Sequence, residues 1–166
     1  MYAATSNGEV FSMDEMTGQR RWKYATGFPV MRAPAVVDEK VFVTSDEPTL
    51  HCIDAKTGAE LWEAPHVKQF AAASATRVYG VDDLGAFVVL DLNHGTLLGR
   101  RMPSDTLTHA LVNDQTDRVF LVSKAGVVQC FHEIGAKQPV YHRPKVEPAA
   151  PPAPTAEGQP AAAATT

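Results

Sequence analysis

The sequence predicts an all-β fold made of repeated units of short antiparallel strands. A frame that reads Asp-x-x-Thr-Gly-x-x-x-Trp occurs twice, as Asp14–Trp22 and Asp54–Trp62. Weaker copies follow at Asp91–Gly95 and at His132–Gly135. A period of roughly 40 residues in units of short strands is typical of propeller blades. We therefore expect a partial β-propeller of about four blades.

Each piece of the frame has an expected structural role. The acidic residue can accept hydrogen bonds from backbone N–H groups two or three residues further on, and Thr-Gly closes the turn because Gly takes positive φ. The Trp on the next strand is spaced to lie flat across a neighbouring unit. The residues expected to fill these turn and docking roles are Asp14, Thr17, Gly18, Trp22, Asp54, Thr57, Gly58, Trp62, Asp91 and Gly95.

The strands follow from β-branched and aromatic runs bounded by turn residues. The inner runs are apolar at consecutive positions, which indicates burial on both faces. No segment carries a sustained helical period, and the opening strands are rich in small residues, which suit the crowded axis of a propeller. The expected strands are 1–5, 9–14, 19–25, 32–37, 41–45, 49–54, 59–64, 69–74, 78–81, 87–91, 96–102, 107–113, 119–123 and 127–131.

Composition divides the chain into a folded region and a tail. Residues 1–143 form the blades, whereas residues 144–166 are Pro- and Ala-rich, lack aromatic residues, and are expected to be disordered. No apolar run is long enough to span a membrane, and the first residues do not resemble a signal peptide. The formal net charge of −4 and the lack of a basic stripe argue against nucleic-acid binding.

The first unit lacks the innermost strand that the later units carry. The tail cannot supply it, so a closed ring is not expected from these residues alone. We expect the chain to be the C-terminal portion of a larger propeller whose N-terminal blades are missing, or one whose start was placed at an internal codon. Its unpaired strand edges would be prone to aggregation.

The repeated frames resemble the PQQ-like, or tryptophan-docking, blade first described in quinoprotein dehydrogenases. The same repeat builds the propeller lipoprotein of the outer-membrane barrel-assembly machinery and sensor domains of some bacterial kinases. The resemblance covers residues 1 to about 143, with two complete frames; Gly99 replaces Trp in the third, and the fourth has lost Asp, Thr and Trp. It implies a propeller fold and a location in the bacterial periplasm or at the outer membrane, although the segment itself does not fix the compartment.

Several residues invite a chemical interpretation beside a structural one. Cys52 and Cys130 occupy equivalent positions in units separated by a whole blade, too far apart for a disulfide, and we expect both to be buried. A redox or metal role is the alternative. The histidines show no metal-ligand spacing, and two of them replace turn residues, so surface or capping roles are expected; they are His51, His66, His94, His109, His132 and His142.

The repeated aspartates and tryptophans could also have a catalytic or ligand-binding role. Asp14, Asp54 and Asp91 could form a catalytic set, but one per turn spaces them around the ring. Trp22 and Trp62 could be a cofactor-stacking or sugar-binding platform, but their place in the frame favours docking between blades. No nucleophile signature, phosphate loop or non-repeating pair of carboxylates is present in the sequence.

The expected function is a non-catalytic scaffold or sensor module for protein–protein interaction, with no cofactor. Its expected partners are other proteins and the missing blades of the same propeller. The alternative is part of a quinoprotein dehydrogenase that holds pyrroloquinoline quinone with calcium, its catalytic residues lying in the missing blades. Propellers bind through the channel mouth, and the residues expected near that rim are Arg32, Lys68, Gln69 and His109.

Overall fold

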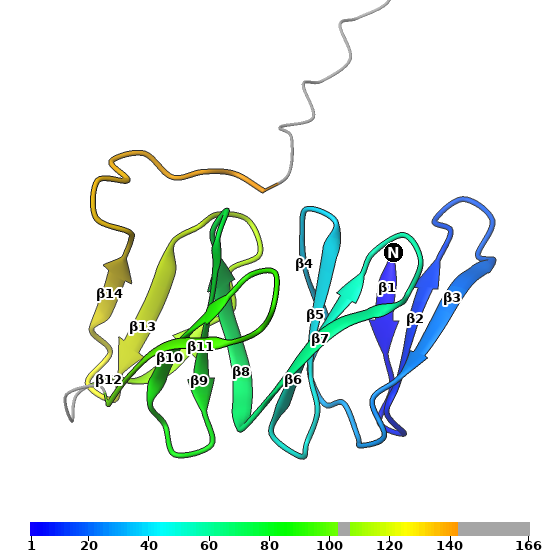
Figure 1. Ribbon diagram of the computed structural model, residues 1–166, viewed down its shortest axis with the longest axis horizontal. Helices are drawn as coiled ribbons and strands as arrows, with labels where there is room; N and C mark the ends of the chain where they lie inside the picture. Colours follow the sequence, from blue (N-terminus) through cyan, green and yellow to red (C-terminus); the bar gives the residue numbers. More distant parts are fainter. Residues whose placement is uncertain (103–106, 143–166) are drawn as a thin grey trace, which may run out of the picture.

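The computed structural model describes residues 1–102 and 107–142 of the chain. Within these ranges the strands form four antiparallel sheets, which follow one another side by side in chain order (Figure 1). Each sheet is built from consecutive strands, so each is one unit of the repeat. The all-β prediction is confirmed, and the arrangement is that of a partial propeller.

The first two sheets contain three and four strands. Sheet one comprises β1 (Tyr2–Ala4), β2 (Glu9–Met13) and β3 (Arg20–Ala25). Sheet two comprises β4 (Ala35–Val37), β5 (Lys40–Thr44), β6 (Thr49–Asp54) and β7 (Glu60–Pro65). The first sheet therefore has one strand fewer than the second, as expected from the sequence.

The last two sheets contain four and three strands. Sheet three comprises β8 (Val67–Ala73), β9 (Arg77–Asp82), β10 (Phe87–Asp91) and β11 (Leu97–Arg101). Sheet four comprises β12 (Leu107–Leu111), β13 (Val119–Ser123) and β14 (Val128–Phe131). No helix among the described residues is long and apolar enough to cross a bilayer. The expected tail, 144–166, lies outside the described residues.

A register irregularity recurs just before the frame turn in three blades. The pairing to the outer strand shifts between Ser12 and Met13, between Cys52 and Ile53, and between Val89 and Leu90. In each case the shift falls immediately before the frame aspartate. A bulge bends a strand and re-aims its side chains. Its recurrence makes it part of the blade architecture, although the sequence pattern did not reveal it.

Three apolar clusters fill the spaces between successive sheets. On β5, Val41 and Val43 belong to the cluster between sheets one and two, whereas Phe42 belongs to the next cluster. On β8, Phe70 faces sheet two and Ala71 faces sheet four. An inner strand therefore needs apolar residues on both of its faces. This is the physical reason for the consecutive apolar runs in the sequence.

The two cysteines occupy equivalent register positions but have different surroundings. Cys52 pairs with Phe42, and Cys130 pairs with Phe120. Both thiols are free, and Cys52 is buried while Cys130 is exposed. The expectation that both are buried is thus wrong for Cys130. Sheet three covers Cys52, whereas no described sheet covers the corresponding face of sheet four, where Val128 is 57% exposed.

We predict that the two thiols differ strongly in reactivity. Burial raises the pKa of the Cys52 thiol to about 12, so this thiol stays protonated at pH 8 and is shielded from reagents. Because the thiolate is the nucleophile, alkylation of Cys52 should be at least about a hundredfold slower than that of Cys130. Mass spectrometry after timed iodoacetamide labelling measures both rates. A Cys130→Ser variant should retain only the slow reaction, and equal fast rates in the native chain would contradict the burial.

Candidate functional site

The frame turns are closed by their aspartates in three blades. In the second blade, Asp54 Oδ1 accepts the N–H groups of Lys56 (3.0 Å) and Thr57 (2.7 Å) and the Thr57 hydroxyl (2.8 Å). Asp14 and Asp91 accept the corresponding pairs of backbone N–H groups. Hydrogen bonds to Thr57 lower the pKa of Asp54. In each turn one oxygen of the aspartate, Oδ1, is thus engaged in closing the turn.

Trp22 of the first blade lies on the frame turn of the second. Its indole N–H donates to the Ala55 carbonyl at 3.0 Å, and the side chain is only 8% exposed. Gly58 sits beneath the ring: a Cβ added there would lie 2.7 Å from Trp22 Cδ2. The glycine also has φ of +76°. Only glycine satisfies both the backbone conformation and the close approach of the ring.

Trp62 repeats this contact one blade further on. Its indole N–H donates to the Leu92 carbonyl at 2.9 Å, and a Cβ on Gly95 would lie 2.5 Å from Trp62 Cε3. Each Trp therefore joins its own blade to the next through one hydrogen bond and one flat contact. Both indoles are buried, so neither presents an open stacking face.

The contact between the third and fourth blades is different. Gly99 stands where Trp would dock, and nothing lies within 4 Å of a Cβ added at Gly135. Instead, Glu133 accepts hydrogen bonds from the hydroxyls of Ser74 (2.8 Å) and Tyr79 (2.7 Å). These bonds lower the pKa of Glu133. A polar network thus takes the place of the indole, and no repeat pattern in the sequence pointed to it.

We predict that the cost of adding a methyl group to a frame glycine depends on the indole above it. Gly18 and Gly58 occupy the same frame position with φ of +71° and +76°, but nothing lies within 4 Å of a Cβ at Gly18. Gly18→Ala should cost about 1–2 kcal/mol from its conformation alone. Gly58→Ala should cost at least about 1 kcal/mol more, because the methyl group displaces Trp22. Urea unfolding measures both, and equal losses would refute the docking contact.

We also predict that removing the second indole destabilises the chain strongly. Trp62→Ala should lower the free energy of unfolding by about 3–5 kcal/mol, since a large aromatic side chain leaves a cavity between two sheets. The neighbouring Leu61 is 46% exposed, so Leu61→Ala is the control and should cost less than about 1 kcal/mol. A Trp62→Ala value within about 0.5 kcal/mol of the native chain would exclude the docking role.

Two of the four expected rim residues line a common groove. Arg32 and Gln69 border a groove of about 390 Å³ together with Val112 and Asp114, over a floor formed by residues 33–35. The amide of Gln69 donates to the Ala110 carbonyl, which fixes the side chain across two blades. The other two expected residues, Lys68 and His109, are exposed but do not line this groove.

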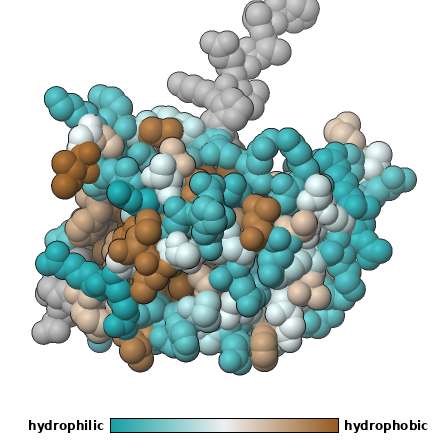
Figure 2. Space-filling view, viewed as in Figure 1, coloured by the Kyte–Doolittle hydropathy of each residue, from teal (hydrophilic) through white to brown (hydrophobic). Residues whose placement is uncertain are grey.

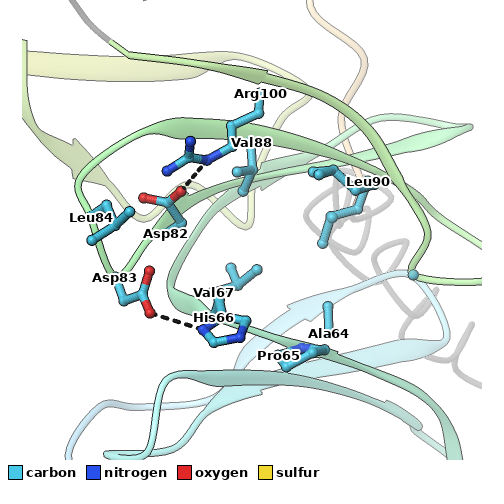
Figure 3. Close-up of a pocket in the computed structure, with 12 residues that line it drawn as sticks. Ala64, Pro65, His66, Val67, Asp82, Asp83, Leu84, Val88, Leu90 and Arg100 are labelled. Atoms are coloured by element: carbon cyan, nitrogen blue, oxygen red, sulfur yellow. Dashed lines mark hydrogen bonds and ion pairs between the residues drawn. The ribbon is translucent and has the colours of Figure 1, made fainter.

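A second cleft opens between sheets two and three, next to the Trp62 contact. It has a volume of about 590 Å³, within the range of ligand pockets. Its walls are apolar and include Val67, Val88, Leu90 and Leu97, with Pro65 at one side. Figure 3 shows two ion pairs at its edge, Asp82 with Arg100 (2.6 Å) and Asp83 with His66 (3.0 Å). The hydrogen bond with His66 lowers the pKa of Asp83. No pattern in the sequence marks these residues as a group.

Figure 2 shows how hydrophobic side chains are distributed on one face of the molecule. They gather on the half that contains the later sheets, while the end formed by β1–β3 is mostly hydrophilic. The exposed large apolar side chains of sheets three and four include Leu84, Leu97, Leu98, Leu111, Val127, Val128 and Phe131. On this face the later blades therefore expose more apolar side chains than the end formed by β1–β3.

Repeated blades joined by an indole on the next glycine turn define a tryptophan-docking β-propeller. Residues 6–98, more than half of the chain, match the family model described as outer membrane protein assembly factor BamB. The chain belongs to this family of PQQ-like propellers, as the resemblance of its frames predicted.

Solved structures share the fold at low sequence identity. BamB from Moraxella catarrhalis is 18% identical, with 80% of this chain and 46% of that one covered and a TM-score of 0.57. The computationally designed Ika4 protein is 22% identical, with 79% and 83% covered and a TM-score of 0.62. A europium-containing methanol dehydrogenase is 19% identical, with 60% and 22% covered and a TM-score of 0.50. The chain thus spans less than half of the BamB structure. No curated protein sequence matches it significantly.

Proposed function

We propose that this propeller segment is a non-catalytic scaffold that binds protein partners in the assembly of outer-membrane proteins. The family match carries the proposal, because the model that matches residues 6–98 describes an outer membrane protein assembly factor. The corresponding location is the periplasmic side of the bacterial outer membrane. The partner surface is the channel rim, where Arg32 and Gln69 border one groove and Lys68 and His109 add exposed polar groups.

The structural roles of the groups that repeat along the chain support the scaffold. The aspartates of three blades accept hydrogen bonds within their own turns, and both indoles are buried against the next blade. What varies between blades is the loop residues at the ends of the strands. Loops on a rigid framework are the usual place for binding residues.

We predict that a charge reversal at the rim weakens partner binding. The probe is purified outer-membrane assembly machinery lacking its own propeller subunit, immobilised for surface plasmon resonance. Arg32→Glu should weaken binding of the chain at least about tenfold, as expected for a charge reversal in an interface. Arg101→Glu, an exposed position on the outer strand β11, is the matched control and should bind like the native chain. Equal binding by Arg32→Glu and the native chain would exclude this rim.

The same proposal implies that the chain does not use pyrroloquinoline quinone. A quinone site needs a stacking floor, a cation held by oxygen ligands and a base near the reactive carbonyl. The two indoles are candidates for the stacking floor and the turn aspartates for the base, but they already make the contacts described above. Equilibrium titration with the quinone and Ca²⁺ should show no saturable binding. Micromolar binding with dye-linked oxidation of an alcohol would establish the dehydrogenase alternative instead.

A further inference from the structure

Equivalent strand positions at two successive blade junctions carry different chemistry. In the cleft of Figure 3, Val88 pairs with Arg100 and Leu90 pairs with Leu97 across β10 and β11. One blade earlier, His51 pairs with Glu63 and Ile53 pairs with Glu60 across β6 and β7. Thus His51, Glu60 and Glu63 stand where Val88, Leu97 and Arg100 stand in the next blade. A requirement common to all blades cannot explain these three polar residues.

The three side chains converge at the junction of the first and second blades. His51 Nδ1 lies 3.6 Å from Glu60 Oε2 and 3.9 Å from Glu63 Oε2. One donor atom from each residue lies within 4.8 Å of the other two. Tyr24 of β3 closes the cluster from the neighbouring blade, with its hydroxyl 3.0 Å from His51 Nδ1 and hydrogen bonded to Glu60.

The imidazole is buried, whereas the two carboxylates are partly exposed. His51 is only 4% exposed, and its Nε2 has no hydrogen-bond partner among the described residues. The ring makes its polar contacts to Tyr24, Glu60 and Glu63 through Nδ1, which faces the carboxylates. The side chains of Glu60 and Glu63 are 39% and 60% exposed. A buried nitrogen donor thus faces two partly exposed oxygen donors.

The cluster also lacks a balancing cation. Within the described ranges, no Lys or Arg forms an ion pair with Glu60 or Glu63, whereas Glu9 and Glu39 are each paired with a lysine. Two carboxylates therefore lie close together with no lysine or arginine from the described part of the chain between them. Like charges held this close favour a bound cation or a proton.

We propose that His51, Glu60 and Glu63 form a binding site for a divalent transition-metal ion of the Zn²⁺ type. One imidazole nitrogen and two carboxylate oxygens are donors that suit Zn²⁺. Ligands at about 2.0–2.2 Å from a tetrahedral ion lie about 3.4 Å from one another. The two nitrogen–oxygen separations of 3.6 and 3.9 Å need to shrink by only a few tenths of an ångström, and the two carboxylate oxygens lie within 4.8 Å of each other.

Tyr24 then acts as a positioning residue. Its hydroxyl donates a hydrogen bond to the Glu60 carboxylate. A donor to a ligating carboxylate fixes its orientation, as outer-shell groups do in metal sites. Because Tyr24 lies on β3 and the three ligands lie on β6 and β7, a bound ion would strengthen the junction between two blades.

The test is Zn²⁺ binding by the metal-free 166-residue chain at pH 7. Isothermal titration calorimetry should show one ion per chain, and Glu63→Gln should weaken the affinity at least about tenfold. Co²⁺ gives a second readout, since a tetrahedral site produces intense visible absorption that the variant should lose. Saturating Zn²⁺ should raise the Tm of the native chain, because the ion binds the folded state.

Two further variants make the result decisive. His66→Gln removes a His–carboxylate pair that lines the cleft of Figure 3, 3.0 Å from Asp83, and should bind Zn²⁺ like the native chain. His51→Gln should abolish binding, but Glu63→Gln tests the site even if His51→Gln does not fold, since Glu63 is largely exposed. Equal affinity of Glu63→Gln and the native chain, or no saturable binding up to millimolar Zn²⁺, would overturn the site and leave a cluster balanced by protons alone.

Discussion

The architecture depends on one contact, an indole lying flat on a glycine of the next blade. Trp22 on Gly58 and Trp62 on Gly95 each combine a buried aromatic face with an N–H donated to a turn carbonyl. The contact couples two requirements, because the turn must place a residue without Cβ at positive φ directly beneath the ring. The frame aspartate fixes that turn by accepting its N–H groups. Asp, Gly and Trp therefore act as one unit spread over two blades, which is why they recur together.

Where the unit is lost, the chain replaces it with polar bonds. The fourth turn has no indole above Gly135, and Glu133 reaches back to Ser74 and Tyr79 of the third blade. The Gln69 amide bridges to Ala110, and the Asn113 N–H donates to the Ala71 carbonyl. Directional bonds of this kind depend on particular side chains and do not repeat. The decayed fourth frame is thus consistent with a blade that is held by different means.

The fold was predictable from the sequence because the blade repeats its requirements. The two complete frames and the partial frame Asp91–Gly95 together locate two indole contacts and three turns. The consecutive apolar run Val41–Val43 reflects a strand that packs against both neighbours. The site was less predictable. Arg32 and Gln69 share a groove, but Lys68 and His109 do not line it, because which side chains face one groove depends on twist and bulges that no pattern encodes. Cys130 was misjudged for a similar reason: burial at a repeat position requires a neighbouring sheet on that side.

The positions that vary between blades are where this chain carries its own chemistry. At the first two junctions the frame holds backbone and indole in the same relation, while the residues beside the contact differ. Between sheets two and three the lining of the cleft is apolar and is edged by Arg100. Between sheets one and two the equivalent positions carry an imidazole and two carboxylates. The chemistry of one junction can therefore change while the frame stays the same, because His51, Glu60 and Glu63 are not the residues that form the indole–glycine contact.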